Sequence, residues 1–171
     1  MKKILLPALL STLLVACGGT GGPQSGASIE DRNGAGVASV TADGVSGSGI
    51  AQLTDPSSIL SRRSVYFDFD SFTVRPDFSS LVEAHAEFLK RNPEMRMMIQ
   101  GNTDERGSRE YNLALGQKRA EAVKRALVML GVSDNQIESV SLGEEKPRCT
   151  ESTESCFAEN RRSDMLYSGE F

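Results

Sequence analysis

The sequence predicts an α/β fold of the α+β sandwich type, in which two helices pack on one face of a four-stranded sheet in the order β-α-β-α-β-β. Between residues 64 and 167, short segments rich in β-branched and aromatic residues alternate with segments whose apolar residues recur every three or four positions. Residues 18–56 show neither pattern and are rich in Gly, Ser, Ala and Thr. We therefore expect one domain over residues 58–171, preceded by a flexible tether over residues 17–57.

Each element follows from its local pattern. A helix opens at Pro76, whose fixed φ suits a first turn, and ends before Pro93. Its apolar stripe contains His85, which we expect to be a core residue rather than a ligand. A second, longer helix begins after the N-cap Ser108 and ends near Leu130. Strands are expected at residues 64–70, where the chain then enters a loop, and at residues 95–101, 137–142 and 163–167.

The first sixteen residues have the pattern of a signal peptide. Two lysines precede an apolar run that is shorter than the ~20 residues needed to span a bilayer. The run ends in Leu-Val-Ala followed by Cys17, which resembles the bacterial lipobox. That resemblance implies cleavage before Cys17 and lipidation of its thiol. Gly18, where an inner-membrane lipoprotein would carry Asp, favours an outer-membrane location with the domain in the periplasm.

Composition argues against several function classes. The formal net charge is −4, so the chain lacks the basic excess that nucleic-acid binding requires. His85 is the only histidine, which argues against a histidine-based triad or a multi-histidine metal site. We therefore expect no metal and no cofactor.

The second helix carries an arginine on its apolar stripe. Arg119 lies four residues after Leu115 and four before Val123, so it faces the core. A buried guanidinium must be paired or bound to an anion, and Asp104 is the nearest partner by chain geometry. Spacing alone leaves two alternatives open: a structural ion pair, or a zwitterion pocket in which Arg119 takes a carboxylate, Asp104 an ammonium, and Asn112 adds hydrogen bonds.

Three spaced segments of the chain resemble the OmpA-like peptidoglycan-binding domain family. They are Asn-Thr-Asp-Glu-Arg-Gly at residues 102–107, Tyr-Asn at 111–112 and Leu-Gly-Gln-Lys-Arg-Ala at 115–120. Tyr-Phe-Asp-Phe-Asp at residues 66–70 and Asn-Arg-Arg at 160–162 extend the resemblance over residues 65–167. One position departs from the family, which usually has His where this chain has Asn102.

The resemblance implies a wall-binding lipoprotein. It implies that Asp104 and Arg119 bind the amino-acid end of diaminopimelate in the stem peptide of peptidoglycan. The rim of the site would be completed by Thr103, Asn112, Leu115, Phe67 and Asp68. It also implies a periplasmic partner, the Tol-system propeller protein TolB, and a role in envelope integrity and in outer-membrane constriction during cell division.

Two alternatives remain. The carboxylate pairs Asp68–Asp70 and Asp104–Glu105 could serve a peptidoglycan hydrolase, although we expect no enzyme. The chain could also be an OmpA-like wall anchor outside the Tol system. The pairs Glu105–Arg106 and Arg161–Arg162 are interpreted as solvated or rim charges.

Lipidation of Cys17 would leave two cysteines. The signal peptide directs the chain to the oxidising periplasm, so we expect a Cys149–Cys156 disulfide in a loop between the third and last strands. Because both cysteines are far from Asp104 and Arg119 in sequence, we expect the bridge to order that loop and to have little effect on ligand binding.

Overall fold

The computed structural model describes residues 47–171, so the expected signal peptide, Cys17 and most of the tether lie outside the described residues. None of the helices described in this range is long and apolar enough to cross a membrane. The elements are α1 (Gly47–Thr54), η1 (Ile59–Ser61), β1 (Ser64–Tyr66), η2 (Pro76–Phe78), α2 (Ser79–Arg91), β2 (Met97–Asn102), α3 (Arg109–Met129), η3 (Asp134–Gln136), β3 (Ile137–Gly143), α4 (Glu154–Asn160) and β4 (Arg162–Tyr167).

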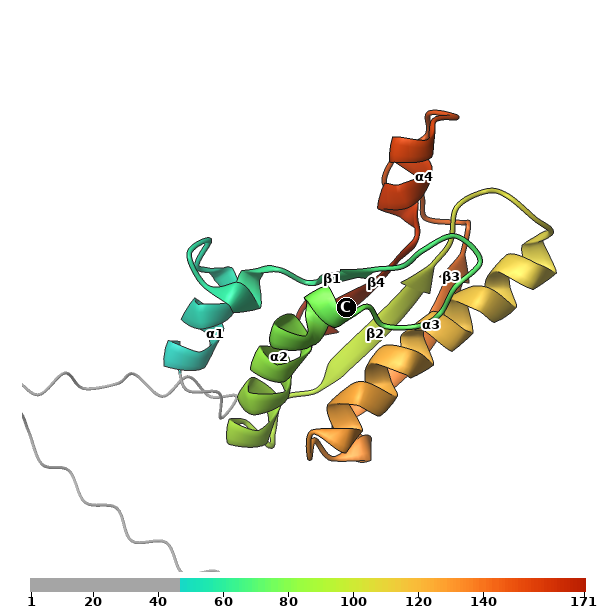
Figure 1. Cartoon of the computed structure of the whole chain (residues 1–171). Coiled ribbons are helices and arrows are strands. Elements are labelled where there is room, and N and C mark those ends of the chain that lie inside the picture. The colour runs from blue at the N-terminus through green and yellow to red at the C-terminus, as the bar shows by residue number, and fades with distance from the viewer. Residues whose placement is uncertain (1–46) are drawn as a thin grey trace, which may run out of the picture. The chain divides into compact units, whose positions relative to one another are not determined.

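The four strands form one mixed sheet in the order β1-β4-β2-β3. Strand β2 runs parallel to β3 and antiparallel to β4, and β1 pairs antiparallel with β4. Helices α2 and α3 lie side by side over the same face of this sheet (Figure 1). The predicted fold class is therefore confirmed, with α3 as the crossover between the parallel strands β2 and β3.

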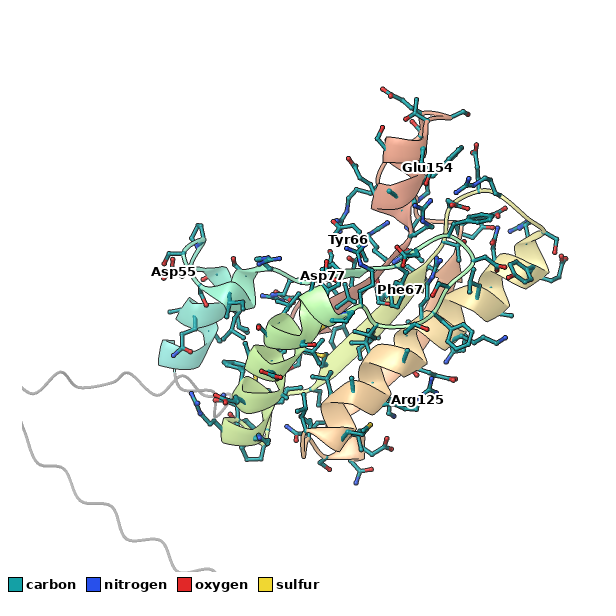
Figure 2. All side chains as sticks on the ribbon, viewed as in Figure 1. Asp55, Tyr66, Phe67, Asp77, Arg125 and Glu154 are labelled. Atoms are coloured by element: carbon teal, nitrogen blue, oxygen red, sulfur yellow. A yellow bond between two sulfur atoms is a disulfide. The ribbon has the colours of Figure 1, made fainter. Side chains whose placement is uncertain are left out.

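The core lies between this sheet face and the two helices. Alternate residues of β2 and β4 point towards the helices and are at most 1% exposed: Met97, Ile99, Met165 and Tyr167. The helices contribute Leu89, Val123 and Leu127, each fully buried. Figure 2 shows Phe67 near the end of the sheet beside α3, whereas Arg125 lies farther along the same helix, where its side chain is exposed.

Two elements differ from the expectation. The chain we expected to be a tether up to residue 57 contains α1, and Leu53 of this helix joins the core together with Leu60. The loop expected between β3 and β4 contains α4, which begins where the Thr153 hydroxyl accepts a hydrogen bond from the Cys156 amide. Both helices have at most eight residues, too few for apolar periodicity to reveal them.

His85 is a fully buried core residue, as the sequence predicts. Its Nδ1 lies 2.8 Å from the Tyr167 hydroxyl and its Nε2 lies 2.9 Å from the carbonyl oxygen of Arg62. Burial lowers the pKa of His85 from 6.5 to about 4, and the neighbouring charge of Arg63 acts in the same direction. The folded protein therefore holds this imidazole neutral.

This burial predicts a pH dependence of stability. Between about pH 6.5 and pH 4 the unfolded chain binds a proton at His85 that the folded chain does not, so the free energy of unfolding should fall as the pH falls. The expected loss across this window is about 3 kcal/mol. Urea unfolding at a series of pH values should show a shallower slope for His85→Gln than for the wild type. Identical slopes would show that another group causes the dependence.

Candidate ligand-binding site

Arg119 is fully buried, and its guanidinium binds backbone carbonyls from two separate segments. Nε donates to Ser71 (2.8 Å), Nη2 to Asp68 (3.2 Å) and Nη1 to Asn102 (3.0 Å). The guanidinium also lies 5.3 Å from the ring centroid of Phe67. Burial lowers the pKa of Arg119 to about 10, against the opposing influence of Asp104, so the side chain remains a cation at neutral pH.

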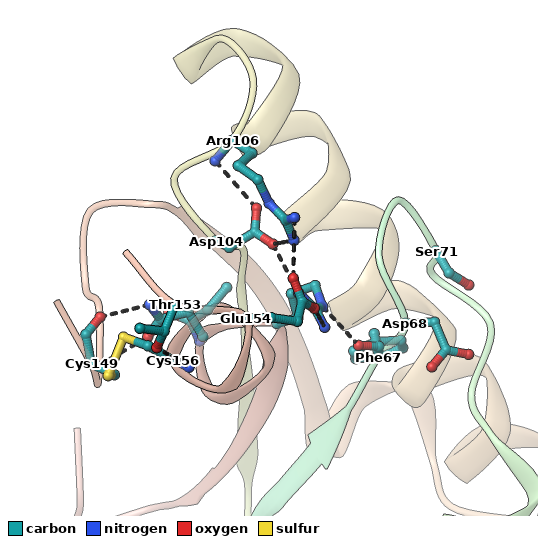
Figure 3. A network of polar contacts seen from close by, with 12 residues as sticks. Phe67, Asp68, Ser71, Asp104, Arg106, Cys149, Thr153, Glu154 and Cys156 are labelled. Atoms are coloured by element: carbon teal, nitrogen blue, oxygen red, sulfur yellow. Dashed lines mark hydrogen bonds and ion pairs between the residues drawn. A yellow bond between two sulfur atoms is a disulfide. The ribbon is translucent and has the colours of Figure 1, made fainter. Parts of the chain in front are cut away.

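Asp104 is 4% exposed and is held by two other arginines. Its Oδ2 lies 2.7 Å from Nη2 of Arg106 and 3.1 Å from Nη1 of Arg161 (Figure 3). Burial alone would raise the pKa of Asp104, but the hydrogen bonds from these two guanidiniums hold it below its usual range. The direct Arg119–Asp104 ion pair that the sequence offered as one alternative is absent among the described contacts, because carbonyl oxygens occupy Arg119 instead.

Asp104 and Arg119 nevertheless line the same small cavity, whose volume is about 30 Å³. Two more of the predicted site residues, Asn112 and Leu115, also line it. Helix α3 supplies three of these four side chains at helical spacing, and the loop after β2 supplies Asp104. The structure therefore brings together the charged pair and two of its five predicted rim residues.

The other predicted rim residues lie elsewhere. Phe67 is buried beneath Arg119, and the side chain of Asp68 is 70% exposed and 3.6 Å from Arg75. Thr103 faces a different cavity, because successive residues of the loop point to opposite sides. Strand β1 ends at Tyr66, so Asp68 and Asp70 lie in the turn that follows rather than on one face of a strand. Asp70 there accepts a hydrogen bond from the Tyr111 hydroxyl.

Sequence reasoning missed Arg161 as a residue that completes the cavity wall. Arg161 and its neighbour Arg162 are each only 6% exposed, so neither is a solvated charge. Arg161 binds Asp104, Glu154 and the carbonyl oxygen of Phe67. Two adjacent arginines near a chain end are typical of a surface, and their spacing gave no indication of these partners.

Arg106 was also interpreted as a solvated or rim charge, yet it packs between two aromatic rings. Its guanidinium lies 4.2 Å from the ring centroid of Phe69 and 4.5 Å from that of Phe157. It also lies 3.2 Å from the Glu154 carboxylate. Its side chain is 36% exposed, so Arg106 stands between the cavity and solvent.

Cys149 and Cys156 are joined by a disulfide across a sequence separation of seven residues. The bridge links the loop after β3 to α4, which also carries Glu154 and Phe157 (Figure 3). These two side chains contact Arg106, so the helix that the bridge holds lies next to the cavity, although both cysteines are far from Asp104 and Arg119 in sequence. Distance along the sequence did not reveal that α4 packs beside the loop after β2.

Asn102, where the family usually has His, is 1% exposed. Its side-chain amide donates to the carbonyl oxygen of Gln100 (3.1 Å), while its own backbone carbonyl accepts from Arg119. The Arg119 side chain contacts only the main-chain oxygen of Asn102, so this hydrogen bond does not use the side chain at position 102.

A family model described as the OmpA family matches residues 66–161, more than half of the chain. The chain belongs to the OmpA family. Relatives in curated sets carry the name peptidoglycan-associated lipoprotein, and the resemblance stated from the sequence is thereby confirmed. The Pseudomonas putida protein of that name is 39% identical over 165 residues, which cover 95% of each chain. The Pasteurella multocida protein is 45% identical over 103 residues, covering 60% of this chain and 69% of the relative.

Solved structures agree with this assignment. The crystal structure of the peptidoglycan-associated lipoprotein from Burkholderia pseudomallei is 57% identical, with a TM-score of 0.68, and covers 68% of this chain and 99% of that one. The C-terminal domain of Helicobacter pylori MotB is 22% identical, with a TM-score of 0.58, over 63% of this chain and 84% of that one. The second likeness shows the shared fold alone.

Proposed function

We propose that this protein binds peptidoglycan non-covalently, through the diaminopimelate of the stem peptide, and thereby links the outer membrane to the cell wall. The observation that carries the proposal is that a buried cation, Arg119, and a buried anion, Asp104, both line one cavity. The free end of diaminopimelate bears an ammonium and a carboxylate on one carbon, so it needs both charges within a short distance. The relatives are named peptidoglycan-associated lipoproteins, which supports peptidoglycan as the polymer that is bound.

Arg119 retains hydrogen-bonding capacity for a carboxylate. A guanidinium has five N–H groups. Three donate to backbone carbonyls, one from each nitrogen, so each terminal nitrogen keeps one N–H with no acceptor among residues 47–171. Two N–H groups on neighbouring nitrogens match the two oxygens of a carboxylate. The three carbonyl oxygens fix the plane of the Arg119 guanidinium before any ligand binds.

The ammonium would bind Asp104 in place of Arg106. The cavity of about 30 Å³ holds little more than a water molecule, so a side chain at its mouth must move to admit an amino-acid end. Arg106 is the more exposed of the two arginines on Asp104, with 36% exposure against 8% for Arg161. After leaving Asp104 it would still have Glu154 and two aromatic rings as partners.

We propose the same non-catalytic role that the relatives' names describe. A general acid needs a carboxyl group that holds a proton near neutral pH. The two guanidiniums on Asp104 lower its pKa and keep it ionised. Asp104 is therefore a poor general acid for glycoside hydrolysis, and turnover of purified peptidoglycan is the direct test.

The rest of the proposal concerns the assembly. Lipidation at Cys17 would anchor the chain in the outer membrane and place the domain in the periplasm, where the tether lets it search for the wall. We propose TolB and the other components of the Tol-Pal system as partners, with a role in envelope integrity and in constriction of the outer membrane during division. The names of the relatives support the lipoprotein assignment.

Replacing Arg119 tests the ligand site. Arg119→Ala would remove three hydrogen bonds to buried backbone carbonyls and would destabilise the fold, so the conservative change Arg119→Lys is the sharper test. An ammonium cannot reproduce the planar fork, and we expect the full chain in detergent to lose more than tenfold in affinity for isolated sacculi, about 1.4 kcal/mol.

The matched control is Arg125→Lys, an exposed position on the same helix. Free diaminopimelate should displace wild-type protein from sacculi. If the Arg119→Lys variant has a native circular dichroism spectrum and is retained on sacculi as well as the wild type, the proposed ligand site is ruled out.

Replacing Arg106 should have the opposite effect. Arg106→Ala removes the guanidinium that competes with a ligand ammonium for Asp104, and it widens the mouth of the cavity. We expect sacculus binding to become several-fold tighter. Arg109→Ala, which removes an exposed arginine paired with Glu145, is the control. If Arg106→Ala binds as weakly as Arg119→Lys, Arg106 contacts the ligand itself and does not compete with it.

Replacing Cys17 tests the anchor. Cys17→Ala removes the thiol that would carry the acyl chains, each buried methylene of which contributes ~0.8 kcal/mol to membrane binding. After a high-salt wash, membrane fractionation should recover the wild type in the outer-membrane fraction, whereas the variant should be absent from that fraction. Co-fractionation of the variant with outer membranes would contradict anchoring through Cys17.

A further inference from the structure

A second, larger cavity lies on the other side of the loop after β2. Its volume is about 430 Å³, the size of an amino acid or a small organic ligand. Thr103 and Glu105 line it, whereas Asp104 and Arg106 line the cavity described above. The remaining wall comes from the start of α3, from the loop after β3 and from α4. The two cavities thus share the loop but not its side chains.

The charge of this cavity is strongly negative. Its lining contains a single arginine, Arg109. It also contains four glutamates: Glu105, Glu144, Glu145 and Glu151. Arg109 pairs with Glu145 at 2.6 Å. Glu144 accepts a hydrogen bond from the Asn112 amide, and Glu105 lies 3.4 Å from the Ser152 hydroxyl. Among residues 47–171, Glu105, Glu144 and Glu151 have no cationic partner.

Thr103, one of the residues that line this cavity, carries a buried hydroxyl group. Thr103 is only 3% exposed and its backbone amide donates to the carbonyl oxygen of Gly143. Its hydroxyl, on the wall of the cavity, has no hydrogen-bond partner among the described residues. Buried hydroxyls are normally hydrogen-bonded, and leaving one unpaired costs about 1–3 kcal/mol. A ligand with an N–H donor would satisfy it.

The wall is held in place before any ligand binds. The Cys149–Cys156 disulfide closes it on one side. The side-chain oxygen of Asn160 accepts from the amides of Arg148 and Cys149, and its amide nitrogen donates to the carbonyl oxygen of Cys149. The ring of Phe157 adds an apolar surface. A site fixed in this way loses little entropy on binding.

We propose that this cavity binds a primary ammonium carried on an aliphatic chain. Its unpaired carboxylates and the Thr103 hydroxyl would take the N–H groups, and Phe157 would contact the chain. A metal ion is a poorer occupant, because no three acidic, histidine or cysteine side chains among the described residues are arranged to hold one. The proposal goes beyond wall binding and does not depend on Asp104 or Arg119.

Chemical-shift titration of the isotope-labelled full chain in detergent tests this site, with pentylammonium as the probe. We expect saturable shifts of the backbone amide resonances of Glu105, Thr150 and Glu151. Tetramethylammonium, which has the same charge but no N–H donor, should bind at least tenfold more weakly.

Glu151→Gln and Glu105→Gln should each lower the affinity for pentylammonium at least threefold. Glu159→Gln, an exposed glutamate of α4 outside the cavity, should leave its affinity unchanged.

Thr103→Val removes the unpartnered hydroxyl at nearly constant side-chain shape. It should also lower the affinity for pentylammonium at least twofold. Three results would overturn the proposal: equal affinities for the two cations, chemical shifts that do not saturate, or an unchanged affinity for pentylammonium in Glu151→Gln. Each would indicate only non-specific electrostatic attraction of cations to the acidic surface.

Nα-acetyl-lysine methylamide distinguishes the two sources of this chemistry. Tighter binding than pentylammonium assigns the cavity to a lysine-like side chain of a peptide, and weaker binding assigns it to a free alkylamine.

Discussion

The buried guanidinium of Arg119 is the interaction on which both the loops and the proposed ligand site depend. Removing a charge from water is unfavourable unless hydrogen bonds compensate for it, and here three backbone carbonyls do so. Two of them belong to the turn after β1 and one to the end of β2. The same side chain therefore fixes the chain segments around the cavity and is itself part of the cavity wall. Stability and binding cannot be separated completely at this residue.

Arg119 reaches these carbonyls because α3 approaches β2 unusually closely. A Cβ atom at Gly101 would lie 1.9 Å from the carbonyl oxygen of Gly116, so neither strand nor helix tolerates a side chain at this crossing. Gly116 precedes Arg119 by about one helical turn, and Gly101 precedes Asn102. Contact between the two glycines thus places the guanidinium against the end of β2. A larger residue at either glycine would move α3 and would therefore also move the guanidinium of Arg119.

Periodicity was sufficient to predict the sheet, both long helices and the inward position of Arg119, because each depends on spacing within one element. The partners of Arg119 could not be predicted, since they are main-chain atoms whose positions depend on the turn after β1. Arg161 was missed because its burial results from packing against Asp104, far away in sequence. Helix α4 has seven residues and little apolar pattern, so this segment was expected to be a loop. Resemblance to a family supplied the proposed ligand, since spacing had left the choice between an ion pair and a ligand pocket open.

A zwitterion suits the Asp104–Arg119 cavity better than an ion of either sign. A lone anion would bind Arg119 but would lie near Asp104, and a lone cation would compete with two guanidiniums already on that carboxylate. A ligand with both charges can replace Arg106 at Asp104 and meet the free N–H groups of Arg119 in the same step, so no buried charge is left without a partner. The displaced Arg106 keeps Glu154 and the rings of Phe69 and Phe157. In the proposed binding mode this exchange would therefore cost less than breaking an isolated buried pair, and it would select for an amino-acid end over a simple amine or acid.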